Sequence, residues 1–207
     1  MIHVLHVVGN MDYGGAETLL MELYRHIDHE RFVFDFLVHD HQPGFYDDEI
    51  VTLGGQILRV PSIGATSYRT HVKALRNIFY TIDSKTIIHA HINAMNGIIL
   101  QQARRAGAYV RISHSHTHNA QYPLSRIPLR NFSKHLIGRN ATHSMACSIE
   151  AAKFLHSGHL LDESFILNNA IDLERFQPNT VRRNAVRRKL GVGENYAFAH
   201  VGRFEAQ

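Results

Sequence analysis

The fold is decided by residues 2–20, which read IHVLHVVGNMDYGGAETLL. The run that opens this stretch is too continuously apolar for a half-exposed strand, so it predicts a strand covered on both faces, as in a parallel sheet. Gly14 and Gly15 then precede leucines at helical spacing, which predicts a glycine turn and a helix. Because glycine has no Cβ, a phosphate could approach the first helical N–H groups closely. The spacing is not Gly-x-Gly-x-x-Gly, and a turn that merely starts the helix remains an equal alternative.

The composition indicates a globular protein rather than a membrane-spanning or disulfide-rich one. The chain has 207 residues, of which 44% are hydrophobic and 19% are charged. No apolar run approaches the roughly 20 residues of a membrane span, and there is no signal-peptide pattern. The single cysteine, Cys147, cannot form an internal disulfide and is interpreted as a small buried hydrophobe. These features predict a cytoplasmic protein.

The formal net charge is +4 and the calculated isoelectric point is about 9.3. This mild excess is compatible with a basic face toward phosphates or an anionic membrane. It does not indicate a nucleic-acid-binding protein.

Predicted strands and helices alternate along the chain. After the first unit, strands are expected near residues 32–38, 56–60, 86–91, 109–113, 142–147 and 165–168. Helices are expected near residues 45–53, 68–82, 94–106, 127–138 and 148–157. The alternation predicts an α/β fold with a Rossmann-like, doubly wound parallel sheet. Ligands of such sheets bind beyond the carboxyl ends of the strands, so Gly14, Gly15, His89, His91 and loop 114–119 are expected to share one rim.

The pattern changes after residue 170. Residues 1–170 are predicted to form one domain, and residues 171–195 a linker with a basic helix. Residues 196–207 begin with another buried-type strand and are predicted to open a second domain. The sequence is therefore interpreted as a fragment.

Six motifs, in this order along the chain, are similar to those of retaining GT-B glycosyltransferases of the large "group 1" or fourth family. The motifs are GGAE at 14–17, IHAH at 88–91, SHSHT at 113–117, CSIEAAK at 147–153, LNNAIDLERF at 167–176 and HVGRF at 200–204. The set resembles the exopolysaccharide and capsule branch most closely. Asn168 and Ala170 depart from the usual Pro and Gly of the family, and the family's later lysine and paired glutamates lie beyond Gln207.

The resemblance implies an enzyme that moves a sugar from a nucleotide-diphosphate donor to a saccharide acceptor with retention. It places the donor diphosphate against Gly14, Gly15 and Arg203, and the donor sugar beside His116, or beside His114 if the register differs by two residues. The departing phosphate serves as the base, and neither a metal nor another cofactor is expected. Residues 1–207 would form the acceptor-side, N-terminal domain and would be inactive alone.

The histidines allow a different class of enzyme. His114, His116 and His118 alternate, so on an extended chain they share a face and could bind zinc in a metal-dependent hydrolase. No carboxylate cluster accompanies them, which weakens that interpretation. A non-catalytic nucleotide- or carbohydrate-binding module is a third alternative. His89 and His91 are interpreted as structural hydrogen-bonding residues at a strand end.

Three basic residues, Arg126, Arg130 and Lys134, recur at helical spacing on one face of the helix expected over 127–138. Such a stripe is most often a solvated face. Its functional interpretation is attraction to anionic lipid headgroups, which would fit a lipid-linked saccharide acceptor and a peripheral location on the inner face of the membrane.

Overall fold

A computed structural model describes residues 1–118 and 123–200. It divides the chain into two compact units, Met1–Ala170 and Ile171–Gln207. The first unit contains a seven-stranded parallel sheet with the order β3-β2-β1-β4-β5-β6-β7. Its strands are β1 (Ile2–Val8), β2 (Phe32–Val38), β3 (Ile57–Arg59), β4 (Ile87–Ala90), β5 (Arg111–Ser115), β6 (His143–Ala146) and β7 (Phe165–Ile166). The predicted α/β, Rossmann-like parallel sheet is confirmed.

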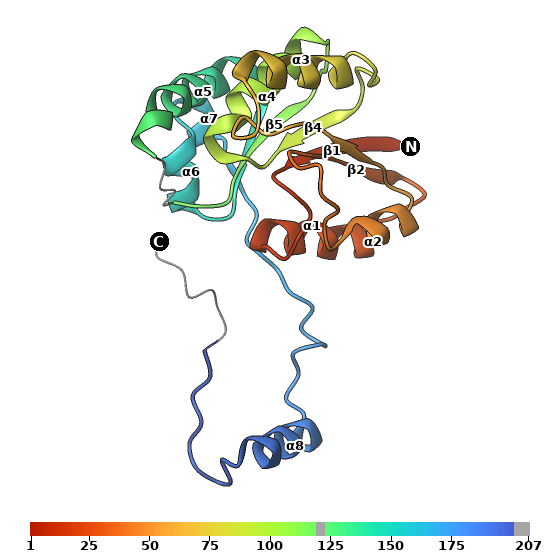
Figure 1. Ribbon diagram of the computed structural model, residues 1–207, viewed down its shortest axis with the longest axis vertical. Coiled ribbons are helices and arrows are strands. Elements are labelled where there is room, and N and C mark those ends of the chain that lie inside the picture. The colour runs from red at the N-terminus through yellow and green to blue at the C-terminus, as the bar shows by residue number, and fades with distance from the viewer. Residues whose placement is uncertain (119–122, 201–207) are drawn as a thin grey trace. The chain divides into compact units, whose positions relative to one another are not determined.

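Helices cover the sheet on both faces (Figure 1). The α-helices of this unit are α1 (Gly15–His26), α2 (Asp47–Thr52), α3 (Tyr68–Phe79), α4 (Asn96–Arg105), α5 (Ile127–Asn140), α6 (Ile149–Leu155) and α7 (His159–Asp162). The short 3₁₀ helices η1 (Asn93–Met95) and η2 (Leu124–Arg126) precede α4 and α5. In Figure 1, α1 and α2 lie on one side of the sheet, and α3, α4 and α5 lie on the other.

The side chains of β1 show why the opening stretch is so apolar. Val4 and Val8 pack in one hydrophobic cluster with residues of α1 and α2. Leu5 and Val7 point to the opposite face and pack in a second cluster with residues of α3 and α4. Because both faces of this central strand are covered, polar alternation is suppressed along it.

The close approach of α4 and α5 depends on a glycine. A Cβ added at Gly97 would collide with the backbone carbonyl of Ser133 in the facing helix. The Ser133 hydroxyl donates to the carbonyl of Ala94 (2.6 Å) and accepts from the N–H of Ile98 (3.1 Å). This contact seats α5 beside the start of α4, close to the carboxyl end of β4.

Strand β5 lies further along the chain than residues 109–113, where the sequence predicted it. Tyr109 is 69% exposed, and the strand runs from Arg111 to Ser115. His114 is therefore a buried strand residue and not a residue of a polar loop, which corrects that prediction. The expected loop 114–119 therefore begins later, after Ser115, and residues 119–122 lie outside the described residues.

The second unit contains α8 (Thr180–Leu190). The Asn179 side chain caps its start by accepting from the N–H of Arg182 (2.8 Å), and Gly191 ends it with a φ of 65°, which favours glycine. Residues 196–200 do not form the strand that the sequence predicted there. Residues 201–207 lie outside the described part.

Across residues 1–118 and 123–200, no helix combines the length and the apolar character needed to cross a bilayer.

Candidate functional site

The strand order reverses between β1 and β4, because β2 and β3 lie on one side of β1 and the remaining strands on the other. In open α/β sheets, ligands bind beyond the carboxyl ends of the strands at such a reversal. The N–H of His91, just after β4, donates to the carbonyl of Val7 in β1 (2.9 Å), so the two strand ends are held together here.

The glycine turn lies between β1 and α1. Gly14 is the N-cap of α1 in an extended conformation, and Gly15 is the first helical residue. A Cβ added at Gly14 would collide with the carboxylate of Glu17, which belongs to the first turn of the helix. A carboxylate in this position already interacts favourably with the helix dipole. A donor diphosphate at this turn would therefore need Glu17 to move, and phosphate binding by Gly14 and Gly15 stays a prediction.

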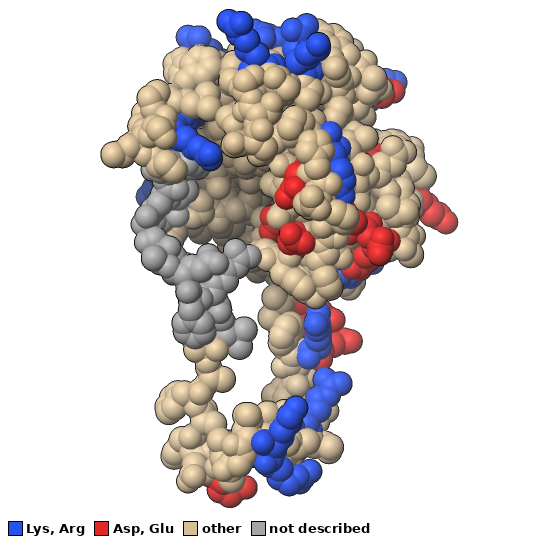
Figure 2. All heavy atoms as spheres, in the orientation of Figure 1, with Lys and Arg blue, Asp and Glu red and all other residues tan. Residues whose placement is uncertain are grey.

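The charge around this turn is also acidic. Figure 2 shows acidic side chains over the region of α1 and α2, on the face in view. Asp47, Asp48 and Glu49 form the first turn of α2, where Arg59 pairs with Asp47 and Arg25 with Glu49. Because these pairs already engage two arginines, a diphosphate here would depend on cations from elsewhere. The family resemblance assigned that role to Arg203, which lies outside the described residues.

His116 follows β5 directly and is partly buried. Its Nε2 lies 2.7 Å from Nδ1 of His91, within hydrogen-bonding distance. Burial lowers the pKa of His116 to about 4, so its imidazole is neutral near pH 7. The ring nitrogen that it can still offer a ligand is Nδ1. His116 thus acts as a neutral hydrogen-bonding group and not as a fixed cation.

His114, the alternative to His116, is a different kind of residue. It is 1% exposed, and its Nδ1 lies 3.1 Å from Nε2 of His89. Its pKa is lowered to about 2, mainly by burial and to a smaller extent by the nearby His116, His89 and His156. Its position in the sheet favours a structural role. His118, the third alternating histidine, is exposed and belongs to neither of the metal-competent histidine groups among the described residues.

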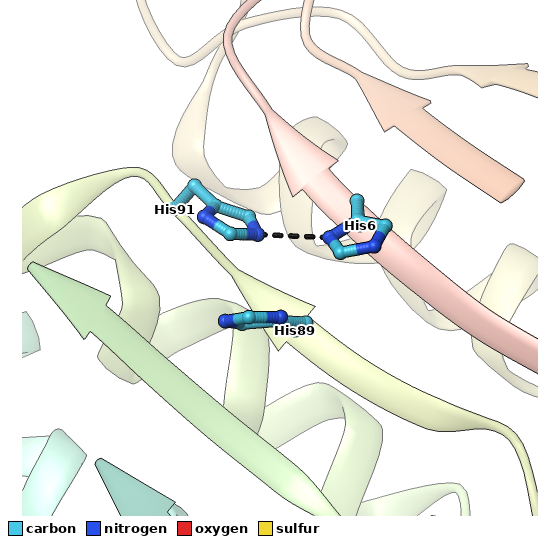
Figure 3. A group of neighbouring side chains, drawn as sticks. All are labelled: His6, His89 and His91. Atoms are coloured by element: carbon cyan, nitrogen blue, oxygen red, sulfur yellow. Dashed lines mark hydrogen bonds between the residues drawn. The ribbon is translucent and has the colours of Figure 1, made fainter. Parts of the chain in front are cut away.

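The sheet register brings histidines of three strands together on one face. His6 of β1 pairs in register with His89 of β4, and His91 follows two positions later on the same side. Ala90 pairs with Ser113, so the next residues, His91 and His114, also lie side by side. Figure 3 shows the rings of His6, His89 and His91 gathered between β1 and β4. His6 carries no sequence signal for this group, because its apolar neighbours mark it as buried but do not indicate which residues it faces.

Asn96 fastens the ends of β4 and β5 beside these histidines, and the sequence did not reveal it. Its side chain is fully buried at the start of α4. Its amide donates to the carbonyl of Ala90 (3.0 Å), the hydroxyl of Ser113 (3.1 Å) and the carbonyl of His114 (3.3 Å), and its oxygen accepts from the N–H of Ile92 (2.7 Å). A single asparagine in a helical segment carries no recognisable sequence signal for this role.

A pocket of about 320 Å³ opens at the same edge of the sheet. It is lined by Gly9, His39, Ser62, Ile63, Gly64, His71, Ile92, Met95, Ile99, Arg126, Leu129 and Arg130. Its lining is mainly apolar, with a few polar groups, which is typical of small-molecule sites. The N–H at Nδ1 of His39 donates to the carbonyl of Val8 (3.0 Å), and Nε2 of His39 is buried without a partner among the described residues. That nitrogen is therefore available as an acceptor.

The three basic residues predicted to form one stripe do not share one environment. Arg126 ends η2, and both Arg126 and Arg130 line the pocket. Lys134 instead donates from Nζ to the backbone carbonyl of Phe154. Leu129 of the same helix lines the pocket beside the arginines, and Phe132 is 50% exposed.

The fold and the site define a Rossmann-like α/β domain whose binding edge lies at the reversal of the strand order. No protein-family model matches the chain. It is 37% identical to a Bacillus subtilis (strain 168) protein named as glycosyltransferase EpsF, over 97% of this chain and 54% of that protein. It is 24% identical to the capsular polysaccharide biosynthesis glycosyltransferase CapH of Staphylococcus aureus, over 99% of this chain and 54% of that protein. The chain thus spans about half the length of these curated relatives.

Solved structures give the same architecture. HepE from Anabaena in complex with UDP and glucose has a TM-score of 0.65 and 16% identity, over 94% of this chain and 52% of that chain. The complex of HepE with UDP has a TM-score of 0.68 and 17% identity, over 94% and 51% of the two chains. At these identities the likeness concerns the fold. Together with the relatives, it confirms the resemblance to glycosyltransferases that the motifs indicated.

Proposed function

We propose that this chain is the acceptor-side domain of a GT-B glycosyltransferase that builds an extracellular or capsular polysaccharide. The observation that carries this proposal is the 37% identity to EpsF over nearly the whole chain. The protein would transfer a sugar from a nucleotide-diphosphate donor to a saccharide acceptor with retention. The UDP and glucose in the HepE complex support a nucleotide-sugar donor. These relatives do not favour the metal-dependent hydrolase that the histidines left open.

In this proposal His116 contacts the donor sugar near its reacting carbon, through the ring nitrogen that does not face His91. The departing diphosphate, held at the turn of Gly14 and Gly15, takes the proton of the acceptor hydroxyl on the same face of the sugar. Residues 196–207 belong to the donor-binding domain, and residues 1–207 alone transfer nothing.

The experiment that tests the proposal is a transfer assay with a panel of UDP- and GDP-sugars. It uses a protein of the relatives' full length that carries this sequence, beside residues 1–207 alone. We expect transfer by the long form only, and a product whose anomeric configuration, read by NMR, equals that of the donor. No transfer with any donor, or an inverted product, would contradict the proposal.

We further propose that the pocket beside His39 holds the acceptor. Its apolar wall suits a lipid chain or a sugar face, and the guanidinium groups of Arg126 and Arg130 suit a phosphate. Nε2 of His39 offers an acceptor for a sugar hydroxyl. A lipid-linked saccharide would satisfy all three features.

His39→Asn tests this placement. Asparagine can keep a donor toward the Val8 carbonyl but lacks an atom at Nε2, so one hydrogen bond to the acceptor is lost. A lost neutral hydrogen bond of about 1 kcal/mol raises the acceptor KM by roughly fivefold to tenfold. The donor KM should not change, and His41→Asn, an exposed neighbour, serves as the matched control. Equal acceptor KM values in His39→Asn and the wild type would place the acceptor elsewhere.

A peripheral membrane contact through Arg126 and Arg130 follows from the same acceptor class. Basic residues near an anionic surface contribute about 1 kcal/mol each, so changing both to glutamine should weaken binding to phosphatidylglycerol vesicles by about 30-fold at low salt. Added salt should release the wild type. Other basic residues, including those of α8, could also attract the vesicles. The control is therefore the double variant Lys73→Gln with Arg76→Gln, which makes the same change of charge on α3. An equal loss of vesicle binding in both double variants would show that the binding depends only on net charge and would contradict a specific contact through Arg126 and Arg130.

A further inference from the structure

The side chains of His6, His89 and His91 form a compact group at the reversal of the strand order. The three residues are 2%, 8% and 7% exposed. One nitrogen from each ring can be chosen so that all three lie within 4.8 Å of one another. Figure 3 shows that the rings come from two adjacent strands and face a common space.

Hydrogen bonding among the imidazoles leaves this group incomplete. Nδ1 of His6 lies 3.0 Å from Nε2 of His91, and Nδ1 of His91 lies 2.7 Å from Nε2 of His116. A neutral imidazole has one N–H and one acceptor nitrogen, so the two hydrogen bonds that link His6, His91 and His116 can run in either direction. In both directions Nε2 of His6 stays buried without a partner among the described residues. An unpaired buried polar atom is costly, so hydrogen bonds among the imidazoles alone do not fully satisfy this histidine group.

We propose that His6, His89 and His91 bind a divalent transition-metal ion of the zinc class, as a structural site that joins β1 to β4. Three neutral imidazoles with one open position are an established donor set for zinc. Zinc–nitrogen distances of about 2.0–2.1 Å place tetrahedral ligand atoms about 3.3 Å apart, close to the 3.0 Å between the His6 and His91 nitrogens. The other ligand atoms, which lie within 4.8 Å of one another, would have to move closer together around the ion.

Neighbouring histidines can orient the ligands. A metal-bound imidazole usually donates its other N–H to a fixed partner, which sets the tautomer. Here Nδ1 of His91 faces His116, and Nε2 of His89 faces Nδ1 of His114 (3.1 Å). His114 and His116, which the hydrolase alternative offered as metal ligands themselves, thus serve as outer partners.

A second group, His91, His114 and His116, has similar spacing. The first group is favoured because His6 of β1 lies directly in register with His89 of β4, and the N–H of His91, just after β4, is bonded to the carbonyl of Val7 in β1. His116 is only partly buried, whereas His6, His89 and His91 are all buried. The family resemblance implied no metal, and the metal-binding alternative was placed on His114, His116 and His118; the ligands proposed here lie in β1, in β4 and just after β4.

The test uses the untagged 207-residue chain, because an added histidine tag would bind metal itself. After treatment with a chelator, the chain is titrated with Zn²⁺ against a chromophoric chelator and, separately, with Co²⁺ while the visible spectrum is recorded. We expect one equivalent of tightly bound Zn²⁺, a Co²⁺ spectrum of tetrahedral type and a higher melting temperature with metal. Absence of stoichiometric binding in the wild type would overturn the proposal without any variant being needed.

Variants then locate the ligands. We expect His6→Asn and His91→Gln each to weaken Zn²⁺ binding by at least 100-fold while circular dichroism shows a folded chain. His135→Gln, an exposed histidine on α5, is the matched control and should bind as the wild type does. Undiminished Zn²⁺ binding in both His6→Asn and His91→Gln would overturn the proposal. Loss of Zn²⁺ binding in His114→Gln and His116→Gln, together with full binding in His6→Asn, would also overturn it. Glycosyl transfer is not a readout here, so the site stands or falls independently of the proposed function.

Discussion

Replacing His116 with alanine, in a protein of the relatives' full length that carries this sequence, is expected to lower turnover by about 10²–10⁴-fold. This is the range typical of a lost catalytic side chain. The proposed reason is its position at the carboxyl edge of the sheet, with one ring nitrogen toward His91 and the other available to the donor sugar. Burial lowers its pKa to about 4, so the neutral ring offers hydrogen bonding across the physiological pH range. The measurement is kcat for sugar transfer, with saturating donor and acceptor.

Two variants make this result interpretable. His118→Ala removes an exposed histidine two residues away and should keep wild-type turnover. His114→Ala removes a buried side chain, so its main expected effect is lower stability, measured by urea unfolding. A fully folded His114→Ala enzyme that loses turnover, beside an active His116→Ala enzyme, would move the catalytic role to His114.

Acid is expected to destabilise the fold, in part through His39 and His156. Burial lowers the pKa of each to about 4; the nearby His71 adds to this for His39 and Lys134 for His156. In the unfolded chain both titrate near 6.5, so below that pH the unfolded state binds more protons than the folded state. Stability is therefore fully present above about pH 6.5 and falls as the pH drops toward 4. Linkage gives a loss of about 2 kcal/mol per histidine between pH 7 and pH 5.

The measurement is the free energy of unfolding in urea at pH 7 and at pH 5. The double variant His39→Gln with His156→Gln removes both titrations and isolates them from those of the other histidines. Its stability should fall by about 4 kcal/mol less than that of the wild type over this pH range. His135→Gln with His143→Gln changes two exposed histidines and should retain the wild-type acid dependence. Parallel pH profiles for the wild type and the buried-site double variant would rule the mechanism out.

The α/β architecture could be read from the sequence because its signals are local. The apolar run of β1 and the helical spacing after Gly15 each depend on residues close together in the chain, and alternating strands and helices admit few folds other than a covered parallel sheet. The motifs around Gly14 and His89 likewise lie in short segments, so their resemblance to glycosyltransferases was visible without coordinates. Strand ends were less certain, as β5 shows, because a buried histidine and a loop histidine look alike in sequence.

Only the tertiary structure decided which histidines meet. His6 and His91 are 85 positions apart, and their contact depends on the strand order that places β4 beside β1 and on the register that pairs His6 with His89. The pocket beside His39 likewise combines His39, which follows β2, with Arg126 at the start of α5. Hydrophobic periodicity determines which face of each strand is buried. It carries no information on which strands become neighbours, and that choice depends on the packing of the whole sheet.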